Sequence, residues 1–496
     1  MKNAKKVVSK ENKGSPYITF KMKDSTITAV ATPPGRGGIG IIKISGKDAL
    51  SIAESIFVKR KRNNLSEEKG INKSCSKKTK YFESHKLYLG NIVNKEKEKN
   101  IDEVLLSVMK APNSYTKEDV VEINAHSGHI ALNEILKLVI ERGARLAQPG
   151  EFTKRAFING RIDLTQAEAV IDIINAKTKI ALEIASSQVA GKMKKRVGLI
   201  RETLISILTE IDAAIDFPDE VGDDLNINRI KRRIDQEALK PIEKLLDNFE
   251  KGHVIKEGIR LVVAGKPNVG KSSLMNNMAN KERAIVTSFP GTTRDVIEES
   301  ININGIPAII SDTAGLHDSS DPVEVLGIRK AYEHINVSDI ILFMIDASEK
   351  LTKEDYRIQK DFKFKEMILV INKIDLVKED SIIKIPEKWK NIKKIKISAL
   401  YDRGIDELKK IIEKVYLGDF GNSIQNRIIP NLRHKGEIEK CLKSILRVQQ
   451  GLKDEELFEL IAIDIKEAID CLENIIGVSV KEEVLDRIFN RFCIGK

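Results

Sequence analysis

The segment GKPNVGKS, residues 265–272, has the residue types and spacing of a loop that binds nucleotide phosphates. Its glycines allow backbone N–H groups to curve around a β-phosphate, and the Lys271 ammonium can contact the β- and γ-phosphate oxygens. The Ser272 hydroxyl can ligate Mg²⁺. A buried strand is expected before the loop and the helix SSLMNNMAN after it, which is the context that gives the pattern its meaning. The sequence therefore predicts a P-loop.

Two later loops indicate that the base is guanine. NKID (372–375) follows a predicted strand, and its Asp375 carboxylate can accept both N–H donors of guanine, a pairing that adenine lacks. Asn372 is expected to brace this loop, and SAL (398–400) to lie behind the base. A competing base that leaves the buried carboxylate unsatisfied loses the free energy of charged hydrogen bonds. GTP binding is therefore predicted, with a chance glycine loop as the alternative.

The segment DTAG (312–315) ends the next predicted strand but one, where magnesium and the γ-phosphate are expected. Asp312 can approach Mg²⁺ through water, and the Gly315 N–H can meet the γ-phosphate. The familiar small GTPases place a water-orienting Gln directly after this motif, but here Leu316 and then His317 follow. Another group must therefore position water and neutralise the charge that develops during hydrolysis.

Two segments offer oxygen atoms for this purpose. Asn268 places a side-chain oxygen near the phosphates, although an amide that only braces the loop is the alternative. TSFPGTTRD (287–295) offers backbone carbonyls, and its Thr293 hydroxyl can complete the magnesium shell. A monovalent cation held by such oxygens would sit where an arginine finger otherwise reaches. The predicted GTP-binding residues are Asn268, Val269, Gly270, Lys271, Ser272, Ser273, Thr287, Ser288, Phe289, Pro290, Gly291, Thr292, Thr293, Asp312, Thr313, Ala314, Gly315, Asn372, Lys373, Asp375, Ser398 and Ala399.

The elements that must position these loops follow from the periodicity of the apolar residues. Residues 25–157 mix short strands with one clear amphipathic helix, ALNEILKLVIERGA, which predicts an α+β domain. Residues 163–250 have helical spacing, 257–415 alternate strands with helices as in a doubly wound parallel sheet, and the helical period returns after residue 418. The predicted fold class is α/β and α multidomain, with a P-loop GTPase domain inserted into one discontinuous all-α domain.

The predicted domain boundaries follow these changes of pattern. The segments are a disordered basic extension (1–24), an N-terminal domain (25–158), the first helical part (159–256), the GTPase domain (257–418) and the second helical part (419–496). The composition, 41% apolar and 5% aromatic in 496 residues, fits several globular domains.

Cysteine usage and hydropathy bear on the compartment. The four cysteines lie far apart without a C-x-x-C pair, so neither a zinc site nor a redox dithiol is expected, and a reducing compartment fits best. Apolar runs are too short to cross a bilayer, and no secretory signal is seen. We expect a cytoplasmic protein with no membrane partner.

The charge balance favours a polyanionic partner. The net charge is +11 and the pI is about 9.1. Much of the excess lies in two lysine-rich stretches, 1–23 and 58–80, which are read first as a solvated tail and loop. Charge alone therefore supports a nucleic-acid partner only weakly.

Several segments together resemble one family. The P-loop GKPNVGKSSLMN, the switch GTTRD, DTAGL, the N-terminal TITAVATPPGRGGIGIIKISG and the final CIGK, with SYTKEDVVEINAHSG, QPGEFTKRAFINGRIDLTQAEAV and DFPDE, resemble the MnmE (TrmE) family of tRNA-modification GTPases, one of the TrmE-Era-EngA-like GTPases. The similarity extends from about Asp24 to Lys496. It implies a folate-binding N-terminal domain that dimerises, a split helical domain, and an inserted G domain activated by potassium-dependent dimerisation.

The resemblance also implies an activity. Family members form a 5-carboxymethylaminomethyl or aminomethyl group on the wobble uridine of certain tRNAs, together with a flavoprotein partner, MnmG (GidA). The implied cofactors are GTP, Mg²⁺, K⁺ and a tetrahydrofolate derivative, 5-formyl- or methylene-tetrahydrofolate. GTP hydrolysis in the homodimer is then expected to drive closure of the G domains and to reorder the other domains.

Metal and catalytic residues of the G domain follow by position from the same resemblance. The implied potassium ligands are Asn268, Thr287, Phe289 and Thr292. The implied magnesium ligands are Ser272 and Thr293. Glu324, in DSSDPVEVLG, matches the catalytic glutamate that orients the attacking water, although without the resemblance it would be read as solvated surface.

The implied folate residues lie far apart in the sequence. They are Lys43, Glu122, Arg161 and Lys496, and each by itself would be read as a surface charge or a sheet-edge pair. A carboxylate such as Glu122 can accept hydrogen bonds from two N–H donors at the amide edge of a pterin, and cations can pair with the glutamate tail of folate. Lys43 stands where the family usually has Arg, so a point charge replaces a planar fork.

The final stretch RFCIGK (491–496) contains an isolated cysteine. A prenylation box would need an aliphatic residue where Gly495 stands, and a zinc site would need more ligands than this tail offers. A core cysteine is an alternative, but the neighbouring Gly and Lys favour an exposed, mobile end. By resemblance Cys493 is catalytic in tRNA modification and not in GTP hydrolysis. Whether its thiol attacks carbon 6 of uracil or assists one-carbon transfer stays open.

One rival function is compatible with the same G domain. An RNA-binding ribosome-assembly GTPase would switch on RNA without performing covalent chemistry. A scaffold with a vestigial nucleotide site is disfavoured, because Lys271, Ser272, Asp312 and Asp375 are all intact. Folate binding and the presence of modified wobble uridine separate the first rival from the modification enzyme.

Overall fold

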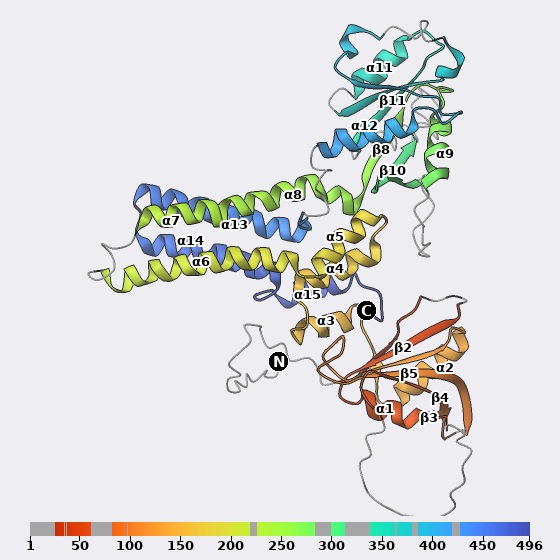
Figure 1. Ribbon diagram of the computed structural model, residues 1–496, viewed down its shortest axis with the longest axis vertical. Coiled ribbons are helices and arrows are strands. Elements are labelled where there is room, and N and C mark those ends of the chain that lie inside the picture. The colour runs from red at the N-terminus through yellow and green to blue at the C-terminus, as the bar shows by residue number, and fades with distance from the viewer. Residues whose placement is uncertain are drawn as a thin grey trace, which may run out of the picture. The chain divides into compact units, whose positions relative to one another are not determined.

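A computed structural model describes residues 25–60, 82–218, 226–282, 299–312, 338–378, 385–418 and 427–496, apart from Pro34, Arg36, Lys97, Lys363 and Phe364. Contacts between residues divide the chain into two units, one with the residues up to Ile171 and Asp470–Lys496, the other with Asp172–Ile469 (Figure 1). Within the described residues, none of the helices combines the length and the hydropathy that a membrane span requires. The boundaries proposed from the sequence remain predictions.

The first unit is built on a mixed sheet. Seven strands of the described residues follow the order β3-β4-β5-β6-β2-β1-β7, and neighbours are antiparallel except that β7 runs parallel to β1. The strands are β1 (Ile27–Val30), β2 (Ile39–Ser45), β3 (Phe57–Lys59), β4 (Lys86–Asn94), β5 (Lys99–Met109), β6 (Val120–His126) and β7 (Arg145–Leu146).

Helices α1 (Ala49–Ile56) and α2 (His129–Glu141) contribute to the main core of this sheet. Alternate residues of the strands, such as Ile42 and Ile123, point into that core, as the two-residue period of a strand requires. Of these two helices, the sequence analysis predicts only α2. The spacing of Ala49, Ile52, Ala53 and Ile56 in α1 is the signal that was available for the other helix.

The opposite side of the sheet carries a second, smaller core. Helix α3 (Glu151–Ile158) contributes Phe152, which packs with Ile27 and Ala29 of β1. Farther along the sheet, Leu87, Leu89 and Leu105 of β4 and β5 are exposed. Helix α15 (Glu482–Phe489) and the start of α4 (Leu164–Asn175) form a third cluster, with Phe157 and Phe489 at its centre.

The helical part of the second unit comes from both sides of the G domain in the sequence. Its elements are α5 (Lys179–Val189), α6 (Lys192–Asp216), α7 (Ile227–Arg233), the π-helical turn η2 (Ile234–Leu239), α8 (Lys240–Glu257), α13 (Leu432–Asp454) and the first part of α14 (Phe458–Ile476). Helix α13 packs against α8 (Figure 1). The return from the G domain is held by two buried amides, since Gln188 donates to the Ile429 carbonyl and Asn248 to the Ile428 carbonyl. The helical domain is therefore discontinuous, as predicted.

The G domain contains six described strands in the order β13-β12-β11-β8-β10-β9. They are β8 (Ile259–Ala264), β9 (Glu299–Ile303), β10 (Ile306–Asp312), β11 (Ile340–Asp346), β12 (Glu366–Asn372) and β13 (Lys393–Lys396). Five run parallel, whereas β9 is an antiparallel edge strand. The predicted doubly wound sheet is present with this one addition. The dipeptide Asn304-Gly305 between two apolar runs, both residues with positive φ, was the available hairpin signal.

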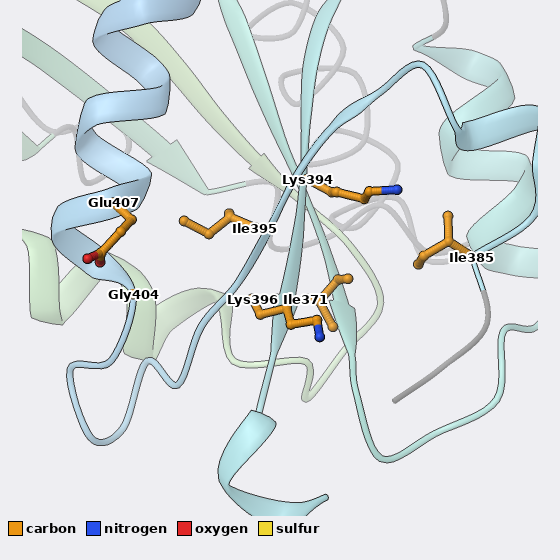
Figure 2. Close-up of a pocket in the computed structure, with 7 residues that line it drawn as sticks. All are labelled: Ile371, Ile385, Lys394, Ile395, Lys396, Gly404 and Glu407. Atoms are coloured by element: carbon orange, nitrogen blue, oxygen red, sulfur yellow. The ribbon is translucent and has the colours of Figure 1, made fainter. Parts of the chain in front are cut away.

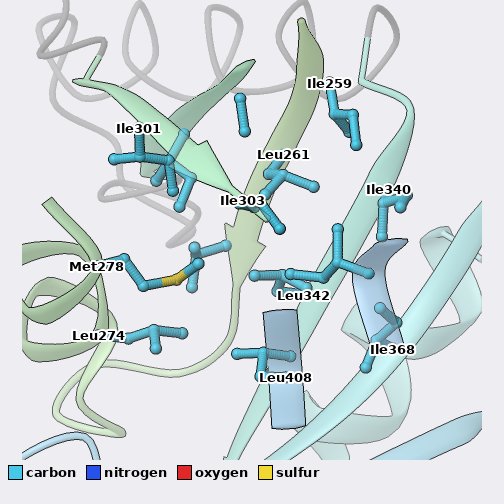
Figure 3. Close-up of a cluster of buried hydrophobic side chains, with 14 of the residues drawn as sticks. Ile259, Leu261, Leu274, Met278, Ile301, Ile303, Ile340, Leu342, Ile368 and Leu408 are labelled. Atoms are coloured by element: carbon cyan, nitrogen blue, oxygen red, sulfur yellow. The ribbon is translucent and has the colours of Figure 1, made fainter. Parts of the chain in front are cut away.

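Helices cover both faces of this sheet. One core joins Leu261 and Leu342 of the strands to Met278 of α9 (Lys271–Glu282) and Leu408 of α12 (Ile405–Leu417), as Figure 3 shows. On the other face Ile358 of α11 (Lys353–Asp361) packs with Phe343 and Trp389. The loops that follow the parallel strands are thereby fixed at one edge of the sheet, where ligands bind in this architecture.

Candidate nucleotide site and tail pocket

The P-loop joins β8 to α9 and takes backbone conformations that its sequence permits. Gly270 has φ +100°, and a Cβ atom added there would lie 2.3 Å from the Asn372 side-chain nitrogen. Asn268 has φ +61°, a left-handed conformation that Asn adopts more readily than most residues. Glycine is therefore required at position 270 for close packing between the P-loop and the NKID loop.

One buried amide joins the three predicted nucleotide loops. The Asn372 side chain is 3% exposed and donates from Nδ2 to the Val269 carbonyl at 2.8 Å. Its Oδ1 accepts from the Ala399 N–H at 2.9 Å. The P-loop, the NKID loop and the SAL loop are thus held in a fixed mutual alignment.

The predicted base-recognition carboxylate is oriented by a hydroxyl from the third loop. Ser398 is fully buried and donates from Oγ to Asp375 Oδ1 at 2.5 Å. The preceding Lys373 has φ +63° and its Nζ lies 2.6 Å from Asp346 Oδ2. Burial by itself raises the pKa of Asp346, but hydrogen bonds from Lys373 and Ser348 outweigh it and hold that pKa below its usual value. The NKID loop is thereby tied to the end of β11.

The residues predicted to meet phosphate and Mg²⁺ lie at the carboxyl ends of adjacent strands. Lys271 Nζ donates to the Gly265 and Lys266 carbonyls of the loop itself, at 2.8 and 2.9 Å. Ser272 lies in the first turn of α9, a turn without acidic residues, where helix N–H groups favour an anion. Asp312 ends β10, which runs parallel to β8. The Ser272 hydroxyl and the Lys271 ammonium fit a magnesium nucleotide.

Part of the predicted G-domain site lies outside the described residues. This applies to Thr287, Ser288, Phe289, Pro290, Gly291, Thr292, Thr293, Thr313, Ala314, Gly315 and Glu324. Of the proposed potassium ligands only Asn268 is described, and of the magnesium ligands only Ser272.

A pocket of about 760 Å³ lies at the β13 edge of the same sheet and is shown in Figure 2. None of the residues that line it is among the predicted nucleotide residues. They are Ile371, Ile385, Lys394, Ile395, Lys396, Gly404 and Glu407.

In the first unit, two of the predicted folate residues approach one aromatic ring, and a third is paired with one of them. Lys43 of β2 lies directly opposite Glu122 of β6, with 3.5 Å between Nζ and Oε1. Lys43 Nζ is also 5.8 Å from the centre of the Tyr115 ring and 5.6 Å from that of Phe152. The Arg161 guanidinium lies 4.7 Å from the Tyr115 ring centre and donates to the Tyr115 carbonyl. Residues distant in sequence are thus gathered into one site.

This cluster of side chains around Tyr115 has an excess of positive charge. Two cations, Lys43 and Arg161, approach the Tyr115 ring, and Glu122 is the carboxylate paired with Lys43. Tyr115 OH lies 3.0 Å from the Thr153 hydroxyl, and burial is the main reason why the pKa of the phenol is raised. The phenol is therefore neutral at physiological pH. Such a site suits an anionic ligand that carries a flat polar ring.

The tail Cys493–Lys496 is packed against this unit. The Lys496 carbonyl accepts from the Phe152 N–H at 3.1 Å, and the Cys493 carbonyl accepts from the Gly150 N–H at 3.5 Å. Gly495 lies so close to β1 that an added Cβ would be 2.8 Å from the Val30 carbonyl oxygen. Cys493 is exposed, as expected. The expectation of a mobile end is wrong, because hydrogen bonds and a close backbone contact hold the tail.

Sequence reasoning missed several residues of this cluster around Tyr115. Tyr115 and Phe152 supply the aromatic rings, and the neighbouring Glu151 and Arg155 form a buried ion pair. All four fall within SYTKED and QPGEFTKR, but only the spacing of Glu151 and Arg155, four residues apart in one helix, indicated an interaction.

The P-loop, the NKID and SAL loops and the doubly wound sheet define a GTP-binding protein of the P-loop class. Residues 164–493 match the family model described as the MnmE helical domain, and residues 26–161 match that of the GTP-binding protein TrmE N-terminus. The chain belongs to the MnmE family of tRNA modification GTPases. The predicted family and fold class are thereby confirmed.

The similarity extends over whole relatives, each named tRNA modification GTPase MnmE. That of Clostridioides difficile (strain 630) is 46% identical over 474 residues, which cover 95% of this chain and 99% of the relative. That of Acetivibrio thermocellus is 44% identical over 477 residues, or 96% of this chain and 100% of the relative. That of Alkaliphilus oremlandii is 42% identical over 474 residues, or 95% and 99%.

Proposed function

We propose that this protein is a GTP hydrolase that forms the 5-carboxymethylaminomethyl or aminomethyl group on the wobble uridine of certain tRNAs, together with a flavoprotein partner of the MnmG kind. The observation that carries this proposal is the similarity to tRNA modification GTPases along 95% of the chain, combined with the intact nucleotide loops. The test is nucleoside mass spectrometry of tRNA from cells that lack the protein. An unchanged wobble uridine would refute the proposal and favour a GTPase without modification chemistry.

Within the G domain, each predicted group has a distinct task. Backbone N–H groups of the P-loop and Lys271 would bind the phosphates, Ser272 and Thr293 would ligate Mg²⁺, and Asp312 would interact with it through water. Asp375 would recognise guanine. Magnesium would neutralise negative charge on the phosphate oxygens. The ordered alignment that Asn372 imposes on three loops supports this assignment.

Potassium is proposed to take the place of an arginine finger. The Asn268 side chain and oxygens of Thr287, Phe289 and Thr292 would hold the ion, and Glu324 would orient the attacking water. The left-handed conformation of Asn268 in the P-loop supports a specialised role for this residue. GTP hydrolysis measured in potassium buffer should exceed that in sodium buffer at equal ionic strength. Equal rates would refute the role of potassium.

A tetrahydrofolate derivative is proposed for the pocket around Tyr115. The carboxylate of Glu122 would accept N–H donors of the pterin, and Lys43, Arg161 and Lys496 would attract the anionic glutamate tail. The convergence of these charges beside two aromatic rings supports the assignment. Calorimetric titration of the full chain with 5-formyl-tetrahydrofolate should show binding that Glu122→Gln weakens. Unchanged affinity would refute the role of Glu122.

The thiol of Cys493 is proposed to act in the modification and not in hydrolysis. Its exposure next to the proposed folate pocket supports this assignment. Cys493→Ser should keep GTPase activity and abolish the modified nucleoside in a complemented deletion strain. A normal nucleoside profile would refute a chemical role for the thiol.

The protein is proposed to act as a homodimer in the cytoplasm. Exposed Leu87, Leu89 and Leu105 on one side of the N-terminal sheet form an apolar surface suited to a second copy. Among the described residues, Cys441, Cys471 and Cys493 form no disulfide, in keeping with a reducing compartment. Leu105→Glu should lower the mass in sedimentation analysis from that of a dimer to that of a monomer. A parent-like dimer would refute this surface as the interface.

A further inference from the structure

A buried carboxylate lies at the start of α3, between two backbone donors that hold the tail. The Glu151 side chain is 5% exposed and accepts from both terminal nitrogens of Arg145, at 2.8 and 2.5 Å. It also accepts from Arg155 at 3.1 Å and from the Gln148 N–H at 2.9 Å. Two cations and one backbone donor thus fix a single carboxylate.

The network continues to the loop that carries Tyr115. Arg155 donates to both carboxylate oxygens of Glu118 at 3.0 Å and to the Ser25 carbonyl at 2.8 Å. The Ser45 hydroxyl donates to the same Glu118 at 2.7 Å. The first turn of α3 and the Tyr115 loop are therefore linked through shared ion pairs.

The residues on either side of Glu151 contact the tail. The Gly150 N–H donates to the Cys493 carbonyl and the Phe152 N–H to the Lys496 carbonyl. Gly150 has φ +66°, and an added Cβ would lie 2.6 Å from the Phe489 carbonyl oxygen, so this backbone allows little displacement. The Phe152 ring faces Lys43 in the cluster around Tyr115. A change in the backbone conformation of residues 150–152 would therefore displace both the tail and the Phe152 ring beside Lys43.

We propose that Glu151 is a positioning residue. Held by Arg145 and Arg155, it fixes the Gly150–Phe152 backbone in the conformation that binds the tail. Through Arg155 and Glu118 it also fixes the position of the Tyr115 loop relative to the tail. The consequence for the reaction rests on the proposed roles of Cys493 and the folate pocket. Removing the carboxylate charge takes away the anion that Arg145 and Arg155 share. Arg155 keeps Glu118 as an anionic partner, but the first turn of α3 loses its charged link to Arg145, so we expect this turn to move.

The test compares Glu151→Gln with the parent full-length protein, and with Glu103→Gln as the matched control. Glu103 is a half-exposed carboxylate of β5 that pairs with Arg60 and contacts neither tail nor pocket. Hydrogen exchange followed by mass spectrometry should show the Gly150 and Phe152 amides, which donate to the tail, and the amides of the tail itself exchanging at least about tenfold faster in Glu151→Gln. Amides of β5 and β6 should keep parent rates, and Glu103→Gln should leave the tail unchanged. Parent-like exchange of the tail in Glu151→Gln would overturn the proposal.

Two activity measurements separate this inference from the proposed function. GTP hydrolysis should stay within about twofold of the parent, whereas wobble-uridine modification and affinity for 5-formyl-tetrahydrofolate should fall about tenfold or more. A loosened tail with normal modification would support the docking role of Glu151 and refute the role proposed for the Cys493 thiol. A loosened tail with parent-like folate affinity would overturn the link to the Tyr115 loop.

A second variant covers the case in which Glu151→Gln disturbs the sheet itself. Arg145→Lys keeps a cation beside Glu151 but cannot bind both carboxylate oxygens in a planar fork. Its tail should also exchange faster while β5 keeps parent rates. Unchanged tail exchange in Arg145→Lys would overturn the proposal in that case.

Discussion

The Asn372 amide provides a sharp test of how the nucleotide loops are held. It donates to the Val269 carbonyl and accepts from the Ala399 N–H, and it is 3% exposed. Asn372→Ala removes both hydrogen bonds without adding bulk. The P-loop and the SAL loop then lose the group that joins them, while β12 and its neighbours keep their own ladder.

The magnitude follows from the two groups that lose their partner. Val269 and Ala399 are both buried, so neither backbone group gains full hydration in exchange. Each buried polar group left unpaired costs about 1–3 kcal/mol. If the loop arrangement that binds GTP is destabilised by about 2 kcal/mol relative to other arrangements, affinity for GTP decreases roughly 30-fold.

The assay is a fluorescence titration with a GDP or GTP analogue that carries a fluorophore on the ribose. Asn391→Ala is the matched control, because Asn391 is an exposed amide in the same domain. We expect Asn391→Ala to bind like the parent and Asn372→Ala to bind about 30-fold more weakly, with the domain still folded by circular dichroism. An affinity for Asn372→Ala within threefold of the parent would show that the amide does not determine the alignment of the loops.

Three further predictions concern the same loops and the ion network. Asp375→Asn should lower GTP affinity at least about 30-fold and favour xanthosine triphosphate, because the guanine N–H donors lose a charged acceptor; parent-like selectivity in competition binding would contradict this. Gly270→Ala should destabilise the G domain by about 1–3 kcal/mol in urea unfolding, because φ is +100° and the new Cβ would lie 2.3 Å from the Asn372 amide; an unchanged midpoint would contradict this. Burial by itself raises the pKa of Glu151, but hydrogen bonds to Arg145, Gln148 and Arg155 hold that pKa below its usual value. The contribution of the ionised Glu151 to stability is therefore complete above the unfolded pKa of about 4.3. It is lost as the pH falls through the lower folded pKa. The difference in melting temperature between parent and Glu151→Gln should therefore be constant near neutral pH and shrink on acidification; a difference that grows below pH 4 would contradict the sign.

The nucleotide loops were predictable because local sequence determines them. Each lies directly after a buried strand of a parallel sheet, and the strand ends meet at one edge. Lys271, Ser272, Asn372 and Asp375 therefore occupy the places that the motifs indicated. The bond from Asn372 to Ala399 was harder to foresee, because it depends on how the loops after two strands are aligned.

The cluster of side chains around Tyr115 was predictable only through resemblance. Lys43 and Glu122 meet because of strand register, which a single sequence does not determine. Tyr115 and Phe152 contribute rings whose position depends on α3, and α3 is held by a buried ion network as well as by the packing of its apolar residues. The docking of the tail joins residues with hundreds of positions between them, so no local pattern can indicate it.

The residues that bind the tail are synthesised long before the tail itself. The Lys154–Asp486 ion pair joins α3 to α15 across 332 positions of the chain. At 5–20 residues per second, a ribosome needs roughly 15 to 70 s to make the intervening segment. The sheet of the first unit therefore leaves the ribosome long before α15 and the tail are made. A prematurely terminated product can carry all the nucleotide loops and still lack the docked tail with Cys493.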